Sequence, residues 1–173
     1  IGSNHSSGDV RGGGIVHCDV DSILVSENVD MGSIIPGNSV NCFGGSGTPG
    51  HSYGRSHDLS IGATAGLPLE VNCVHFGMAS LSMPVTATVK IYKDTNGTAG
   101  PMPDSSDLWL LGSTTIDLNT TSNVMYSATF SAPVQLEVNS LIFVEIIIPE
   151  MFPGTNEIAS NNAGEFSATW LKT

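Results

Sequence analysis

Basic residues are scarce in this sequence: five Lys and Arg stand against sixteen Asp and Glu, which gives a formal net charge of −11. A surface of that sign repels phosphate backbones and anionic headgroups, so neither nucleic acid nor an anionic membrane is expected as a partner. An acidic, Lys-poor surface suits an extracellular protein that its charge keeps soluble, and it is also compatible with divalent cations.

Long apolar runs and helical periodicity are missing as well. No run of eighteen apolar residues occurs, so the sequence predicts no transmembrane helix and no membrane insertion. Gly, Ser, Thr and Asn are abundant, whereas helical proteins favour Ala, Glu, Lys and Leu. At 173 residues the chain is long enough to bury one core. We therefore expect one domain of many short strands joined by tight turns.

Cysteine is limited to Cys18, Cys42 and Cys73, and none of them forms a CxxC pair. That spacing gives no support to a zinc site. In an exported protein, three cysteines would make one disulfide and leave one thiol. We predict a disulfide between Cys42 and Cys73, with Cys18 unpaired or bonded to another chain, although the spacing leaves the other pairings open.

Apolar residues at every second position predict the strands. The stretch Val85–Asp117 contains such a strand, a long acidic loop and a second strand. Ser140–Ile148 is the most apolar run, and its β-branched residues at alternate positions favour strand over helix. Further strands are expected at Ile15–Val25, His57–Ala63, Val71–Ala79, Val124–Ser131, Val134–Val138 and Phe166–Trp170. About nine strands at this spacing predict an all-β, antiparallel two-sheet β-sandwich, jelly-roll-like in form.

The first fourteen residues differ from the rest of the chain. Residues 1–14 are polar and Gly-rich and are expected to form an N-terminal arm or linker, which leaves residues 15–173 as the β-sandwich domain. An arm of this kind could donate a strand to a neighbouring subunit, and head-to-tail contacts that do not close generate filaments. A linker to an upstream domain explains the same composition.

Six blocks of the sequence, taken in their order along the chain, resemble those of a known family. They are SYGRSHDLSI (52–61), VNCVHFGMAS (71–80), VTATVKIYKDTNG (85–97), LWLLGSTTIDL (108–118), LIFVEIIIPE (141–150) and SNNAGEFSATWLK (160–172). In these blocks the chain resembles secreted bacterial β-sandwich modules of large surface or exported proteins, of the Bacteroidetes type with C-terminal sorting signals. The resemblance implies export and a sandwich fold, and it transfers no catalytic residues.

The acidic loop is a candidate calcium site. Asp94, Asn96, Asp104 and Asp107 lie within this Gly- and Pro-rich segment, and hard cations take several oxygen ligands. The EF-hand spacing is missing, however, and Asp and Asn also occupy turns because their side chains bond the local backbone. Other metal candidates are the pair Asp19 and Asp21 and the group His51, His57, Asp58 and His75. No cofactor is required by any of these patterns.

Catalytic signatures are missing too. There is no GxSxG motif and no cysteine placed beside a base, so we predict that the protein is not an enzyme. Sugars would need exposed aromatic side chains, and Tyr92 with Trp109 forms the candidate platform. Three Asn-x-Ser/Thr sequences are candidate glycosylation sites, at Asn4, Asn96 and Asn119.

Two functions remain in view. The first is a non-catalytic extracellular β-sandwich with a structural or adhesive role, such as a subunit of a surface filament that contacts its neighbours through strands. Its partners would be copies of itself or other surface proteins. The second is a calcium-assisted carbohydrate-binding module that uses the acidic loop.

Overall fold

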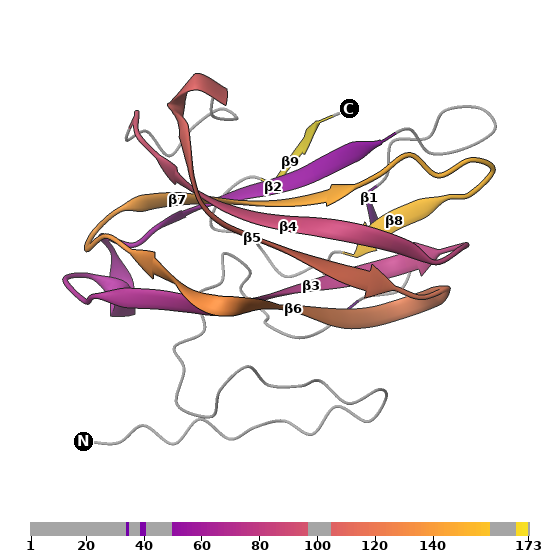
Figure 1. The fold of residues 1–173 in the computed structure, drawn as a ribbon, viewed down its shortest axis with the longest axis horizontal. Coiled ribbons are helices and arrows are strands. Elements are labelled where there is room, and N and C mark those ends of the chain that lie inside the picture. Colours follow the sequence, from indigo (N-terminus) through magenta and orange to yellow (C-terminus); the bar gives the residue numbers. More distant parts are fainter. Residues whose placement is uncertain (1–33, 35–38, 41–49, 97–104, 160–168, 173) are drawn as a thin grey trace, which may run out of the picture.

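The computed structural model describes residues 34, 39–40, 50–96, 105–159 and 169–172, and within these the chain forms two stacked antiparallel sheets (Figure 1). This confirms the predicted all-β, two-sheet β-sandwich. The strands are β1 (Ser39–Val40), β2 (His51–Asp58), β3 (Leu69–Leu81), β4 (Val85–Asp94), β5 (Leu108–Leu118), β6 (Thr121–Leu136), β7 (Leu141–Ile148), β8 (Asn156–Ala159) and β9 (Thr169–Lys172). Two single-turn 3-10 helices, η1 (Gly62–Thr64) and η2 (Ser105–Asp107), precede β3 and β5. None of the helices in the described ranges is both long and apolar enough to cross a membrane.

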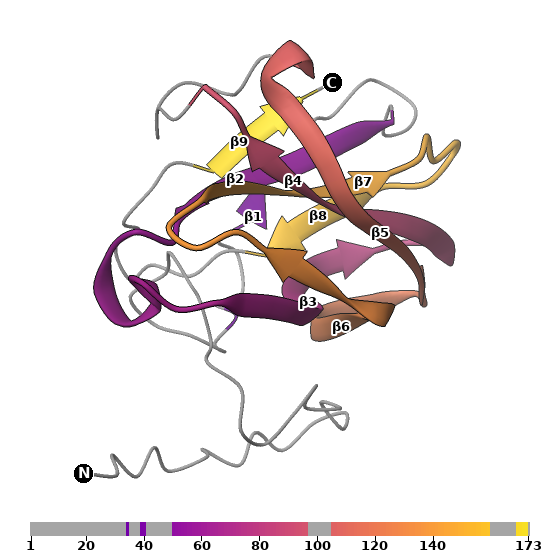
Figure 2. The same cartoon turned by 60° about the vertical axis from the view of Figure 1, so that its left-hand side comes forward.

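The pairing of the strands is nested. One sheet has the order β1-β8-β3-β6, and the other has the order β5-β4-β7-β2-β9. Thus β1 pairs with β8, β2 with β7, β3 with β6 and β4 with β5, all antiparallel. The edge strands β5 and β6 approach each other along one side of the sandwich (Figure 2), where the Thr114 hydroxyl donates to the carbonyl of Thr129 at 2.9 Å.

The core lies between the sheets and follows the alternation in the sequence. On β4, Val89 and Ile91 are fully buried, and on β7, Ile146 and Ile148 lie in the same apolar cluster. The opposite sheet contributes the buried side chains Phe76, Met78, Ala128 and Phe130. Glu145 lies on the outer face of β7, as its place between two core residues predicts.

Strand β6 is longer than the sequence patterns suggest. Val124–Ser131 and Val134–Val138 were expected as separate strands because Pro133 lies between them, but they form one strand that ends at Leu136. β6 is an edge strand, where the missing N–H of proline costs no ladder bond. Its register against β3 also shifts between Val71 and Cys73, which accommodates the extra residues around Pro133.

The prediction of a strand at His57–Ala63 was wrong in its placement. The strand is His51–Asp58, and it pairs with β7 over all eight of its residues. Asp58 then ends it, because its carboxylate accepts hydrogen bonds from the N–H and hydroxyl of Ser60 and so forms a turn. The expected strand Ile15–Val25 and the arm 1–14 lie outside the described residues.

Three chain segments meet at one end of the sandwich because β7 pairs with both of its neighbours there. Asp58, the last residue of β2, lies opposite Leu141, and Lys93, near the end of β4, lies opposite Ile142. The turn that connects β6 to β7 leads into the same end. Residues from distant parts of the sequence are therefore gathered at this end of the sandwich.

Candidate functional site

The base of the acidic loop is closed by hydrogen bonds between the end of β4 and the start of β5. The N–H and hydroxyl of Thr95 both donate to the carbonyl of Asp107 at 2.8 Å. The Asn96 side-chain amide donates to Asp107 Oδ2 at 3.1 Å, and the Asn96 N–H donates to Asp94 Oδ1 at 3.1 Å. Three of the four predicted calcium ligands are therefore brought together, while Asp104 lies outside the described residues.

These contacts leave the calcium prediction open. Asp94 Oδ1 and Asp107 Oδ2 already accept hydrogen bonds from Asn96. A hard cation would need the same two oxygens as ligands. In the described part of the chain, no group of three or more His, Cys, Asp or Glu side chains is arranged to hold a metal ion. Calcium binding by this loop therefore stays a prediction.

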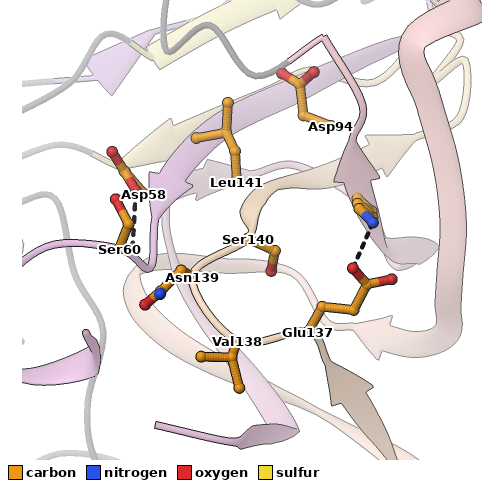
Figure 3. Close-up of a pocket in the computed structure, with 9 residues that line it drawn as sticks. Asp58, Ser60, Asp94, Glu137, Val138, Asn139, Ser140 and Leu141 are labelled. Atoms are coloured by element: carbon orange, nitrogen blue, oxygen red, sulfur yellow. Dashed lines mark hydrogen bonds and ion pairs between the residues drawn. The ribbon is translucent and has the colours of Figure 1, made fainter. Parts of the chain in front are cut away.

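A cavity of about 340 Å³ lies beside this loop, at the end of the sandwich (Figure 3). Its walls come from the end of β2, the end of β4 and the turn between β6 and β7. The lining residues are Asp58, Ser60, Lys93, Asp94, Glu137, Val138, Asn139, Ser140 and Leu141. The antiparallel pairing described above places these segments together, so the cavity is a direct product of the topology.

One pair of charges spans the cavity wall. Lys93 Nζ on β4 lies 2.6 Å from Glu137 Oε2, which follows β6 (Figure 3). Asp58 faces its own turn, where Ser60 donates from its hydroxyl at 2.6 Å and from its N–H at 2.9 Å. The Ser60 hydroxyl, and then its N–H, hold the pKa of the Asp58 carboxyl below its ordinary value, because both bonds favour the charged form.

Two buried polar groups of the wall have no hydrogen-bond partner. Asp94 is only 4% exposed, and its Oδ2 makes no hydrogen bond. Ser140 is 8% exposed, and its hydroxyl is likewise without a partner. A buried polar group left in this state costs about 1–3 kcal/mol, and natural proteins contain few of them. Both residues line the same cavity, but the two unpartnered atoms themselves have almost no accessible surface.

An exposed aromatic side chain lies opposite one residue of the cavity wall. Trp109 is 70% exposed, and it lies directly opposite Lys93 in the β4–β5 ladder, so the two side chains share one face of the sheet. Tyr92 precedes Lys93 and therefore points to the other face. The structure thus does not bring Tyr92 and Trp109 together as one platform, and neither of them is among the residues that line the cavity.

Tyr92 belongs to a separate cluster on the outer face. Its hydroxyl donates to Glu145 Oε2 at 2.9 Å, and Ser52 donates to Glu145 Oε1 at 2.7 Å. Burial, and then the hydrogen bond and negative charge of Glu145, raise the pKa of Tyr92 well above its ordinary value. The cluster joins three neighbouring strands, β2, β7 and β4.

The predicted histidine group is not assembled as a metal site. His51 Nε2 lies 2.7 Å from the Tyr53 hydroxyl in the core, whereas His75 Nε2 lies 3.5 Å from Cys73 Sγ on β3. Cys73 is disulfide-bonded, and the residue with which it pairs lies outside the described residues. The predicted pairing with Cys42, and the role of Cys18, therefore stay predictions.

The other predicted sites are only partly within the described residues. Asn96 and Asn119 are both exposed. Asn4, Asp19 and Asp21 lie outside the described residues. Glycosylation stays a prediction at all three asparagines.

The turn between β6 and β7 was missed by sequence reasoning. Glu137, Asn139 and Ser140 had been assigned to no site, because nothing in the sequence shows which distant residues they approach. One local signal was available in the sequence: Asn139 is a residue type that favours turns, and in the structure it adopts a positive φ of 57°. Its side-chain oxygen accepts a hydrogen bond from the N–H of Gly66 at 2.7 Å, which fixes the turn.

Comparison of the chain with family models, with curated proteins and with solved structures finds no match.

Proposed function

We propose that this protein is a non-catalytic, extracellular adhesive module that recognises carbohydrate at the end of its β-sandwich. The observation that carries the proposal is the exposed indole of Trp109, which lies opposite Lys93 of the wall of a polar cavity in the β4–β5 ladder. Concave polar sites with an adjacent aromatic surface suit ligands that have both hydroxyl groups and apolar faces. Asp94, Asn96, Asp104 and Asp107 are the residues through which calcium would assist this recognition. Binding measured with and without a chelator tests whether calcium takes part.

The fold itself supports a recognition role. We infer that the sandwich is a jelly roll, because its strands pair as a folded hairpin: β1 with β8, β2 with β7, β3 with β6 and β4 with β5. In such an arrangement the loops gather at the two ends of the sandwich. Loops supported by rigid sheets are common places for binding residues.

Export of the chain is supported by one observation of the structure. Cys73 is disulfide-bonded, and disulfides persist in oxidising compartments outside the cytosol. The resemblance to secreted bacterial β-sandwich modules of surface proteins points the same way. We therefore propose a secreted or cell-surface location.

A structural role as a filament subunit is the second candidate. It is favoured by the short edge strands on one side of the sandwich, where β1 has two residues and β9 has four. A sheet edge is a template for a strand from another chain, and β1 and β9 are the strands with which such a strand would pair here. Negative-stain microscopy tests this role, since a filament subunit forms polymers. If the polymers persist unchanged when residues 1–14 are removed, donation of the arm is excluded.

Retention on immobilised polysaccharides tests the adhesive role. We expect the full chain to be retained on at least one polysaccharide, and the Trp109→Ala variant to elute early. Tyr126→Phe provides a control, because Tyr126 lies on the opposite sheet, and this change removes only the hydroxyl that bonds the turn at Asn119 while it keeps the ring stacked on Phe76. If the wild type passes through every column without being retained, the proposal is contradicted. Repeating the experiment with a chelator shows whether retention depends on calcium.

A further inference from the structure

We propose that Asn96, at the base of the acidic loop, is a site of spontaneous deamidation, and that the aspartate formed there breaks the hydrogen bond by which Asn96 holds Asp107. The inference is independent of the proposed carbohydrate recognition. It follows from the residue that comes after Asn96 in the sequence, from the exposure of the Asn96 side chain and from the hydrogen bonds that this side chain makes.

The sequence places the smallest residue after Asn96, and this is the one Asn-Gly pair in the chain. Gly97 has no Cβ, so its backbone nitrogen approaches the side-chain carbonyl carbon of Asn96 with the least steric hindrance. That nitrogen loses its proton and bonds to Asn96 Cγ, and the side-chain nitrogen leaves as ammonia. Water then opens the succinimide ring at either carbonyl, which yields aspartate or isoaspartate. The net reaction consumes one water, releases one ammonia and replaces an amide with a carboxylate.

The structure separates Asn96 from Asn139, which is also exposed and also precedes a small residue. The side chain of Asn96 lies at the surface just after β4, where water reaches it. At Asn139, by contrast, the side-chain oxygen accepts a hydrogen bond from the N–H of Gly66. The backbone nitrogen that would attack Asn139 belongs to Ser140, and its N–H donates to the carbonyl of Glu137 at 3.2 Å. Asn139 is therefore protected by its own turn.

The reaction replaces a hydrogen-bond donor with an acceptor. In the structure, the amide of Asn96 donates to Asp107 Oδ2 at 3.1 Å. An aspartate at position 96 places a carboxylate oxygen where the NH₂ group lies, so two acceptors of negative groups face each other. Asp94 is also close, because its Oδ1 accepts from the backbone N–H of Asn96. Like charges at such distances repel, and the contact with Asp107 is lost.

The backbone contacts at the base of the loop do not depend on the side chain of Asn96. The N–H and hydroxyl of Thr95 both donate to the carbonyl of Asp107. Deamidation to aspartate therefore weakens the closure of the loop without breaking the β4–β5 ladder. We expect Tm to fall by about 2–4 °C, as the loss of one hydrogen bond to a charged group does in a domain of this size.

Mass spectrometry of the full chain measures the reaction. The chain is made in a host that does not glycosylate asparagine, and it is incubated in mildly alkaline buffer prepared with heavy-oxygen water. We expect aspartate and isoaspartate at position 96, each carrying one heavy oxygen, to form at least about tenfold faster than at Asn119, which precedes the branched Thr120. Gly97→Ala should slow the reaction by a similar factor. If position 96 reacts no faster than Asn119 or Asn139, the inference is overturned.

Substitution tests the consequence for the loop. Asn96→Asp reproduces the charge of the product, and Asn119→Asp is the matched control because it adds the same charge at another exposed position. Melting is measured in EDTA, so that no divalent cation neutralises the added carboxylate. We expect the lower Tm for Asn96→Asp only, and most of the loss should be recovered when Asp107→Asn is added, because this exchange restores one donor and one acceptor. If Asn96→Asp melts as the wild type does, or if the double variant recovers nothing, the inference fails.

Discussion

Lys93 and Glu137 join the two sheets across the end of the sandwich, with Nζ 2.6 Å from Oε2. Lys93 belongs to β4 of the five-stranded sheet, and Glu137 directly follows β6 of the four-stranded sheet. The pair borders the cavity on one side. It therefore helps to set the distance between the segments that form the proposed site.

The free energy of this ion pair should be small. Lys93 and Glu137 are 31% and 69% exposed, and such pairs contribute about 0.2–1 kcal/mol because water screens them. A double-mutant cycle with Lys93→Met and Glu137→Gln, followed by urea denaturation, measures the coupling energy. We expect the coupling to fall in about 1 M salt, where the Debye length is about 3 Å. A coupling above about 3 kcal/mol, unchanged by salt, would mean that the pair is desolvated and structural.

Asp94→Asn should stabilise the protein. Asn keeps the oxygen that accepts from the N–H of Asn96, and it replaces the buried carboxylate oxygen that has no partner with a neutral amide group. We expect the free energy of unfolding to rise by about 1 kcal/mol, which corresponds to about 2–4 °C in Tm for a domain of this size. Thermal melting checks this against Asp117→Asn, which should change stability by less than about 0.5 kcal/mol. A lower Tm for Asp94→Asn would show that Asp94 supports the fold itself.

Gly54 leaves room for the ring of Phe143 on the outer face of the five-stranded sheet. A Cβ at position 54 would collide with the ring of Phe143, which is only 1% exposed and has little freedom to move. We expect Gly54→Ala to lower the free energy of unfolding by about 1–3 kcal/mol, as overpacking does. Chemical denaturation measures the loss, and adding Phe143→Leu should restore part of it. Wild-type stability in Gly54→Ala alone would show that the ring is easily displaced.

The acid limb of the stability curve should depend on Ser60. The pKa of Asp58 lies below the ordinary value of 3.8, so folding gains stability above that pH and loses it as the pH falls through the folded pKa. Ser60→Ala removes the larger of the two causes and should raise the pKa of Asp58 towards 3.8. Carboxyl NMR titration checks this, with Ser122→Ala on the exposed part of β6 as the control. An unchanged pKa in Ser60→Ala would mean that the hydroxyl does not contact Asp58 in solution.

The sheets were predictable from the sequence because alternation is a local property. Val85–Asp117 and Ser140–Ile148 carry apolar residues at every second position, and both stretches form strands as expected. Pro133 misled the prediction, because local rules end a strand at proline whereas an edge strand tolerates it. Whether β6 is an edge strand depends on the order of the strands in the sheet, which the local pattern does not contain.

Only some of the residues at the cavity could be predicted from the sequence, because the others are brought there by the order of the strands. Asp94 and Trp109 stood out as unusual residues at a loop, but Glu137 and Ser140 did not. Ser140 reaches the site because β7 places it beside the end of β2, where the N–H of Leu59 donates to the carbonyl of Ser140 at 3.0 Å. Such a contact spans distant parts of the chain, and it follows from the strand order and the register together.

A titration of the full chain with a neutral oligosaccharide, followed by NMR, tests the central claim most directly. The chain has two tryptophans, Trp109 and Trp170, so two indole N–H signals are expected, and Trp109→Phe assigns them. We predict that the Trp109 indole signal and the amide signals of Lys93 and Ser140 shift together with one Kd, while the Trp170 indole signal does not follow them. If saturating sugar leaves these three signals unmoved, or shifts only signals elsewhere, the end of the sandwich is not a carbohydrate site.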